Sequence, residues 1–176
     1  MSDRQALRVP SITDAPRSKQ RIGLSDIQNP MLRKGLAIWE RLRGEKRFPS
    51  RPQMSPREMS GLLRNTVLVK VLDGGAEFQF RIVGDAMVVA QGASFQGMTM
   101  AEIDQALPGY GTMLREVYSR IHETGEPLAF RGWFERSADK RPFFHESLVL
   151  PLAEGQAVDH ILVIGIYAFE YEDALR

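Results

Sequence analysis

The sequence predicts an α+β fold: a five-stranded antiparallel sheet flanked by short helices and one long helix, with a helical extension in front. The stretch before residue 84 shows the period-two alternation of a strand, and a turn separates it from another strand-like stretch. Residues 110–121 show the clearest helical period, and the last third consists of three strand-like stretches. The 176 residues, 43% of them hydrophobic, suffice for one domain with its own core.

The first 28 residues show no hydrophobic periodicity. They mix serine, proline, arginine and aspartate, so we expect residues 1–28 to form a flexible basic N-terminal segment. They contain no apolar stretch typical of a signal peptide, and no run in the chain is long enough to span a membrane. A cytoplasmic protein without a membrane contact is therefore expected.

A helical extension is predicted over residues 29–64. Asn29 can cap a helix, and Pro30 suits its first position. A capping-box pattern at Ser55 predicts a second short helix, to about Leu63. The apolar residues of the first helix form one stripe that needs a partner, either the sheet of the same chain or another protein. The candidate interface residues on this stripe are Leu32, Leu36 and Trp39.

A hairpin and a short helix are predicted next. Strands over residues 66–72 and 77–83 flank residues 73–75, whose Asp-Gly-Gly sequence tolerates the positive φ angles of a tight turn. Asp85 can cap a helix over residues 86–91. The second strand should therefore run into a helix across one glycine.

The remainder of the predicted domain, residues 65–170, contains two helices and three strands. Residues 99–102 form another capping box, and the long helix over residues 110–121 should end at Gly125. Strands are expected over residues 128–135, 143–152 and 158–168. The last strand is apolar at both parities, so helices should cover both faces of the sheet: the long helix one face, the Trp39 helix the other.

Charge is distributed unevenly along the chain. Residues 1–64 contain 14 Lys and Arg against 6 acidic residues, whereas residues 65–176 contain 9 against 16. The two regions could pair within the chain, pair between chains or bind an acidic partner. An ordinary solvated surface is the remaining alternative.

The chain has no cysteine. This excludes disulfides, thiolate zinc sites, a cysteine nucleophile and flavin photochemistry through a cysteinyl adduct.

Three patterns resemble the PAS domain family. Residues 78–84 read F-x-F-R-x-x-G, and residues 97–102 read G-x-T-x-x-E at a helix start. In front of them, residues 39–44 read W-x-x-L-R-G, as in a group of bacterial stand-alone PAS proteins. The resemblance covers residues 29–168 and implies a PAS-like sheet with sensing or protein docking as its role.

The resemblance implies a sensor in signal transduction rather than an enzyme. We expect a stand-alone module that acts by protein–protein interaction with a signalling partner, as a homodimer, under the control of a small ligand. The alternative is a small-molecule receptor whose occupied pocket lies between the sheet and the long helix. A switch of either kind requires two arrangements of the sheet and its flanking helix.

Five residues are candidates for the wall of a ligand pocket, because pockets are mostly apolar with a few placed polar groups. They are Arg81, Met87, Tyr118, Trp133 and His145. Arg81 or His145 would fix the polar end of a ligand. The alternatives are a solvent-facing arginine, an edge histidine and three ordinary core residues.

His122 is the candidate haem ligand, since haem-binding PAS domains present their axial ligand from the long helix. The alternative is a histidine that interacts with the dipole at the end of a helix. The position is offset from the apolar stripe, so haem is disfavoured and the cofactor stays unassigned. The sequence contains no histidine pair with metal spacing, no G-x-S-x-G serine and no phosphate loop, so it predicts neither a metal site nor catalytic residues.

A basic cluster surrounds Phe48 and could contact phosphates. Its members are Arg41, Arg43, Lys46, Arg47, Arg51 and Arg57. A basic cluster alone is weak support, and neither a helix-turn-helix nor a stacking-platform pattern accompanies it. Nucleic acid is therefore not the expected partner.

Overall fold

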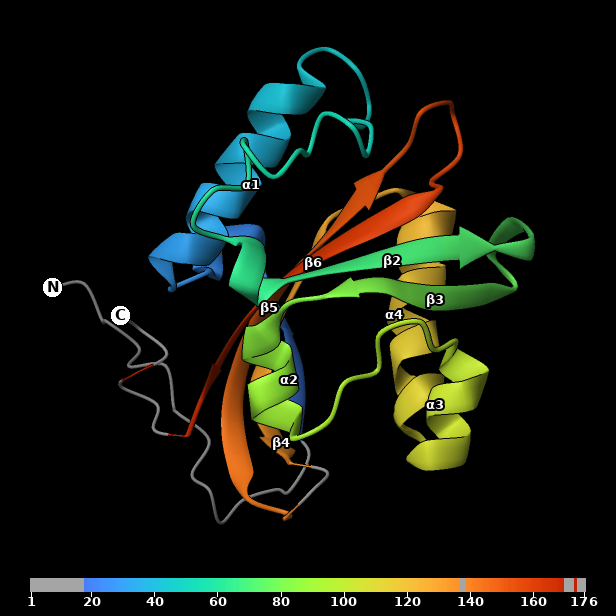
Figure 1. Cartoon of the computed structure of the whole chain (residues 1–176). Helices are drawn as coiled ribbons and strands as arrows, with labels where there is room; N and C mark the ends of the chain where they lie inside the picture. Colours follow the sequence, from blue (N-terminus) through green and yellow to red (C-terminus); the bar gives the residue numbers. More distant parts are fainter. Residues whose placement is uncertain (1–17, 137–138, 170–172, 174–176) are drawn as a thin grey trace, which may run out of the picture.

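The computed structural model describes residues 18–136, 139–169 and 173, and confirms the α+β fold (Figure 1). Its strands are β1 (Ser18–Ile22), β2 (Thr66–Leu72), β3 (Glu77–Val83), β4 (Leu128–Glu135), β5 (Pro142–Leu152) and β6 (His160–Ala168). Its helices are α1 (Pro30–Arg43), α2 (Asp85–Gln91), α3 (Met100–Ala106) and α4 (Tyr110–Thr124), with short 3₁₀ turns η1 (Leu24–Asp26), η2 (Leu63–Asn65) and η3 (Asp73–Gly75). In the described part, no helix is long and apolar enough to cross a bilayer.

All strands belong to one antiparallel sheet with the order β1-β4-β5-β6-β2-β3. Successive residues of a strand point to opposite faces. On β5, Phe143, His145 and Ser147 therefore face α4, whereas Phe144, Glu146 and Leu148 face α1. This alternation places the two helices on opposite faces of the sheet, as predicted (Figure 1).

The sheet has six strands, so the prediction of five was wrong by one edge strand. The additional strand is β1, which lies within the segment expected to be flexible; residues 1–17 of that segment lie outside the described part. β1 pairs with β4 from Ser18 opposite Trp133 to Ile22 opposite Ala129. Its sequence S-K-Q-R-I shows no alternation because an edge strand is held by backbone hydrogen bonds to its neighbour.

The apolar stripe of α1 packs on the sheet of its own chain. Leu32 and Trp39 are buried, and the Trp39 indole Nε1 donates a hydrogen bond to the Pro151 carbonyl at 2.8 Å. Gly35 lies so close to the sheet that an added methyl group would clash with Ile164. Leu32 and Trp39 are therefore not available as an interface with another protein; Leu36 is half-buried.

The connector between α1 and β2 contains turns where a second short helix was predicted. The Met59 N–H donates to the Ser55 carbonyl at 2.9 Å, but the helical conformation ends at Gly61, which has φ +83°. Only η2 follows before β2. The capping box at Thr99 does form, since the Thr99 hydroxyl accepts from the Glu102 N–H at 3.2 Å.

Candidate functional site

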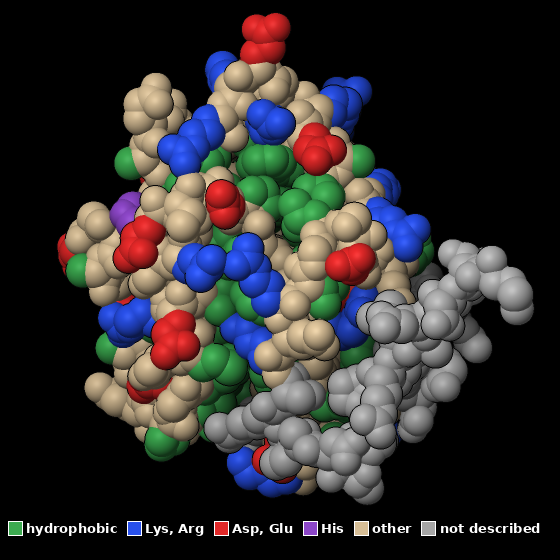
Figure 2. Space-filling model, turned by 180° about the vertical axis from the view of Figure 1, so that it is seen from behind, with side chains coloured by type: hydrophobic (Ala, Val, Ile, Leu, Met, Phe, Trp, Pro, Cys, Tyr) green, Lys and Arg blue, Asp and Glu red, His purple; other side chains and the backbone are tan. Residues whose placement is uncertain are grey.

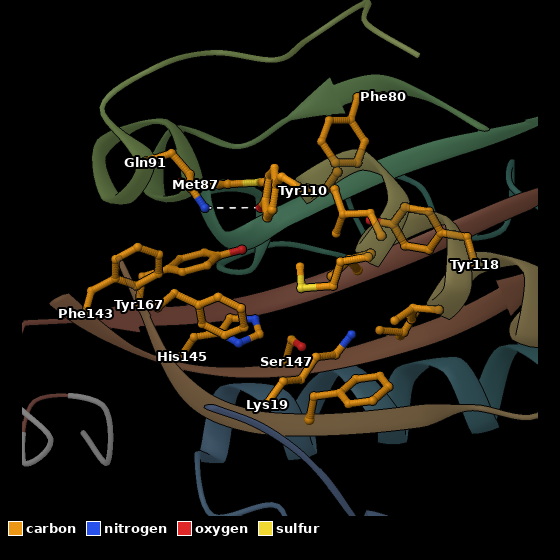
Figure 3. Close-up of a pocket in the computed structure, with 18 residues that line it drawn as sticks. Lys19, Phe80, Met87, Gln91, Tyr110, Tyr118, Phe143, His145, Ser147 and Tyr167 are labelled. Atoms are coloured by element: carbon orange, nitrogen blue, oxygen red, sulfur yellow. Dashed lines mark hydrogen bonds between the residues drawn. The ribbon is translucent and has the colours of Figure 1, made fainter. Parts of the chain in front are cut away.

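A cavity of about 60 Å³ lies between the sheet and α4 (Figure 3). Residues from all six strands, α2 and α4 form its wall, which is mostly apolar. A cavity needs about 10–15 Å³ of such space to hold one water molecule, so this one has room for a few. Pockets for drug-sized ligands have about 300–1,000 Å³. In this arrangement the cavity therefore suits a molecule of a few non-hydrogen atoms.

Polar side chains reach the cavity from two sides. Figure 3 shows Lys19, His145 and Ser147 on one side, with Gln91 and Tyr110 opposite them. Gln91 Nε2 donates a hydrogen bond to the Tyr110 hydroxyl at 3.1 Å, which ties α2 to the start of α4. The cavity wall thus has a hydrogen-bonded polar pair on its helical side and further polar side chains on the sheet.

His145 presents a polar atom without a partner. Its ring stacks on Tyr167, with centroids 5.5 Å apart, and meets Phe134 edge to face at 5.0 Å. The residue is half-buried as a whole, but its Nδ1 has no access to solvent and no hydrogen bond. Burial, to which the positive charge of Lys19 adds, lowers the pKa of His145 to about 3. The imidazole is therefore neutral near pH 7.

Lys19 brings a positive charge to the same wall from β1. Its Nζ lies 4.3 Å from the centroid of the Phe130 ring, a cation–π contact. Burial lowers the pKa of this ammonium to about 8, and the charge of Glu116 on α4 opposes this effect in part. At pH 7 the group is still mostly protonated.

Three of the five predicted wall residues line the cavity: Met87, Tyr118 and His145. The other two lie elsewhere. Arg81 is exposed on β3, where its Nη1 donates to Gln79 Oε1 at 3.2 Å.

Trp133 is buried on the opposite face of the sheet, edge to face with Phe144 at 5.6 Å. The register explains this placement, because the even-numbered residues Phe130 and Phe134 of β4 face the cavity and Trp133 does not. Sequence reasoning missed Lys19, because its strand lacks a periodic signal.

His122 lies outside the cavity wall and holds two loops. Its Nδ1 is 3.0 Å from the Val158 carbonyl and its Nε2 is 3.1 Å from the Gly74 carbonyl. A neutral imidazole donates to one of these two carbonyls, and the ring lies between the two loops and not in the cavity wall, which does not fit an axial haem ligand. Among the described residues, no group of three His, Asp or Glu side chains could hold a metal ion.

Several arginines of the basic cluster hold the connector in place. Arg41 pairs with Glu58, and Arg47 donates to the Thr124 carbonyl at 2.6 Å while its guanidinium lies over the Phe48 ring. On the face that Figure 2 shows, Lys and Arg side chains alternate with Asp and Glu side chains. The charges visible on that face form no single basic patch.

A buried ion pair lies behind the cavity, on the α1 face. Glu146 Oε2 accepts from Arg131 Nη2 at 2.7 Å, and its Oε1 accepts from the backbone N–H groups of Gln28 and Asn29 at 3.0 and 3.1 Å. Arg131 also donates to the Asp26 carbonyl at 3.0 Å. Glu146 lies between two cavity residues on β5, so the cavity strand holds the start of α1 directly.

Comparison with known proteins gave two findings about this arrangement. A family model described as "PAS domain" matches residues 27–168. The structure of the PAS domain from Bordetella pertussis BvgS is similar with 17% identity and a TM-score of 0.47, covering 64% of this chain and 83% of that one. No curated protein matches. Because the family match spans well over half of the chain, we conclude that the chain belongs to the PAS domain family, which points to a sensory or signalling module.

Proposed function

We propose that this PAS domain senses a small molecule in the cavity between the sheet and α4 and reports it through a protein–protein contact. The observation that carries the proposal is the Nδ1 of His145, a buried polar atom without a hydrogen bond in a mostly apolar wall that also holds the charge of Lys19. Buried polar groups in filled cores are nearly always hydrogen-bonded, whereas ligand pockets keep a few free for the ligand.

The buried ion pair offers a route from the cavity to the other face of the sheet. His145 and Ser147 line the cavity, and Glu146 between them holds Arg131 and the first residues of α1. A ligand that shifts β5 also shifts Glu146 and thereby the start of α1. This gives the two arrangements that differential ligand binding can select between. PAS domains are typically sensory modules without catalysis, and the proposal assigns that role here.

For the protein contact we propose a second copy of this chain, docked on a groove of about 570 Å³ on the α1 face of β2 and β3. Leu63 and Ile82 line it and are each 48% exposed, whereas Leu68 and Leu162 beneath them are buried. Arg51 lies at the groove, within the basic first 64 residues, and the rest of the chain is acidic. A second copy therefore offers both apolar surface and opposite charge.

A matched pair of variants tests the sensory proposal. Val163→Phe fills the cavity, whereas Val89→Phe makes the same change on α2, where the side chain is 59% exposed. Protein purified from cells is denatured, and the released small molecules are identified by mass spectrometry. We expect the wild type and Val89→Phe to release a molecule that folded Val163→Phe lacks. Equal release from all three, or none from the wild type, would contradict the proposal.

A further inference from the structure

We propose, as an extension of the sensory function above, that the ligand is a short-chain monocarboxylate whose charge is bound by Lys19. The strand that carries Lys19 precedes residues 27–168, the part that matches the family. The binding site thus includes a segment outside the PAS match.

The strand register brings Lys19 to the cavity. Lys19 lies opposite Gly132 on β4, Gly132 lies opposite His145 on β5, and His145 lies opposite Tyr167 on β6. The four residues form one row across the sheet. Neighbouring strands are about 4.8 Å apart, so Lys19 and His145 are about 10 Å apart at their backbones. Because Gly132 has no side chain, the lysine arm can extend across it toward His145.

The charge of Lys19 indicates an anion. Among the described residues, no carboxylate forms an ion pair with Lys19, and Glu116 acts only as a more distant charge. Partly buried charges are costly unless they are paired. The other polar groups near it can complete the site for a carboxylate: Nδ1 of His145, in the tautomer that carries its proton there, and the hydroxyl of Ser147 both donate. Figure 3 shows the Lys19 amine and the Ser147 hydroxyl on the same side of the cavity.

The size of the cavity indicates a short chain. A volume of about 60 Å³ leaves room for only a few non-hydrogen atoms. The wall beyond the polar row is apolar, with Val149 and Val163 on the sheet and Leu114 on α4. A carboxylate with a short alkyl chain, in acids of about two to four carbons, suits both the small volume and the apolar wall.

The test compares propionate with propionamide, which has nearly the same shape and no charge. Binding is measured by NMR titration of the full chain at pH 7. We expect propionate to bind at least tenfold more tightly than propionamide, because a charge-assisted hydrogen bond is roughly twice as strong as a neutral one. Lys19→Met should weaken propionate binding at least tenfold. Arg21→Met removes a charge from the same face of β1 outside the cavity, and should leave propionate binding unchanged.

Three results would overturn this inference: equal binding of acid and amide, unchanged propionate binding in Lys19→Met, or no propionate binding at all. If Lys19→Met does not fold, the comparison of propionate with propionamide on the wild type decides whether the site binds a negative charge. The mass-spectrometric test with Val163→Phe is independent of ligand charge. A neutral molecule that the wild type releases and Val163→Phe lacks would overturn the carboxylate and leave the sensory function standing.

Discussion

Lys19 is a positive charge in a mostly apolar setting, and this has a consequence for stability that needs no ligand. Burial lowers its pKa to about 8, against about 10.4 in an unfolded chain. Between these two values the unfolded chain holds a proton that the folded chain has released. Unfolding therefore takes up a proton, and stability rises with pH in this window. The groups that face Lys19 are Glu116 on α4 and the neutral His145 on β5.

We predict that the free energy of unfolding of the wild type rises between about pH 8 and about pH 10. Above about pH 10 the tyrosines act in the opposite direction, because burial raises the pKa of Tyr110 and Tyr167 and keeps them protonated only in the folded chain. Urea unfolding at a series of pH values measures how the free energy of unfolding changes with pH. Lys19→Met should lose the rise, and Arg21→Met should keep it. The same slope in both variants would show that Lys19 is not the titrating group.

At the scale of elements, α1 contributes to the stability of the whole fold because its stripe is buried on the sheet. We predict that Trp39→Ala lowers the free energy of unfolding by about 3–5 kcal/mol, as expected for a large buried aromatic side chain. Trp39→Phe keeps much of the packing but loses the hydrogen bond to Pro151, and should cost less, about 1–3 kcal/mol because the Pro151 carbonyl loses its donor.

Urea unfolding monitored by circular dichroism measures both losses. Leu36→Ala, at a half-buried position of the same helix, is the control and should cost less than Trp39→Ala. A loss below about 1 kcal/mol for Trp39→Ala would mean that α1 contributes little to the fold.

The elements that could be predicted are those with a local signal. Alternation located β3, strand-like stretches between turn residues located β2 and β4 to β6, and the helical period located α1 and α4. β1 carries no such signal, since its pairing with β4 depends on residues more than a hundred positions away. The cavity wall could be predicted only in part for the same reason. His145 and Trp133 are both strand residues with a suitable side chain, and only the register between strands decides which of them faces the cavity.

At the scale of the whole molecule, the two oppositely charged parts of the sequence form one folded unit. Arg64 of the basic part pairs with Asp85 of the acidic part at 3.1 Å. Both side chains are exposed, so this pair contributes little to stability. The charge of Arg51 lies beside the exposed apolar residues of the groove, where a second copy could meet it.

We predict that the chain forms a dimer that weakens as salt rises from about 0.1 M to about 1 M, over which the Debye length falls from about 10 Å to about 3 Å. Sedimentation equilibrium at several protein concentrations measures the affinity.

Ile82→Asp places a charge in the groove and should abolish association, because an unpaired carboxylate is costly in an apolar interface. Val89→Asp makes the same kind of change at an exposed position outside the groove and should leave association unchanged. A monomer at every concentration would refute the dimer, equal effects of the two variants would refute the groove as its contact, and an affinity independent of salt would refute charge complementarity as its cause.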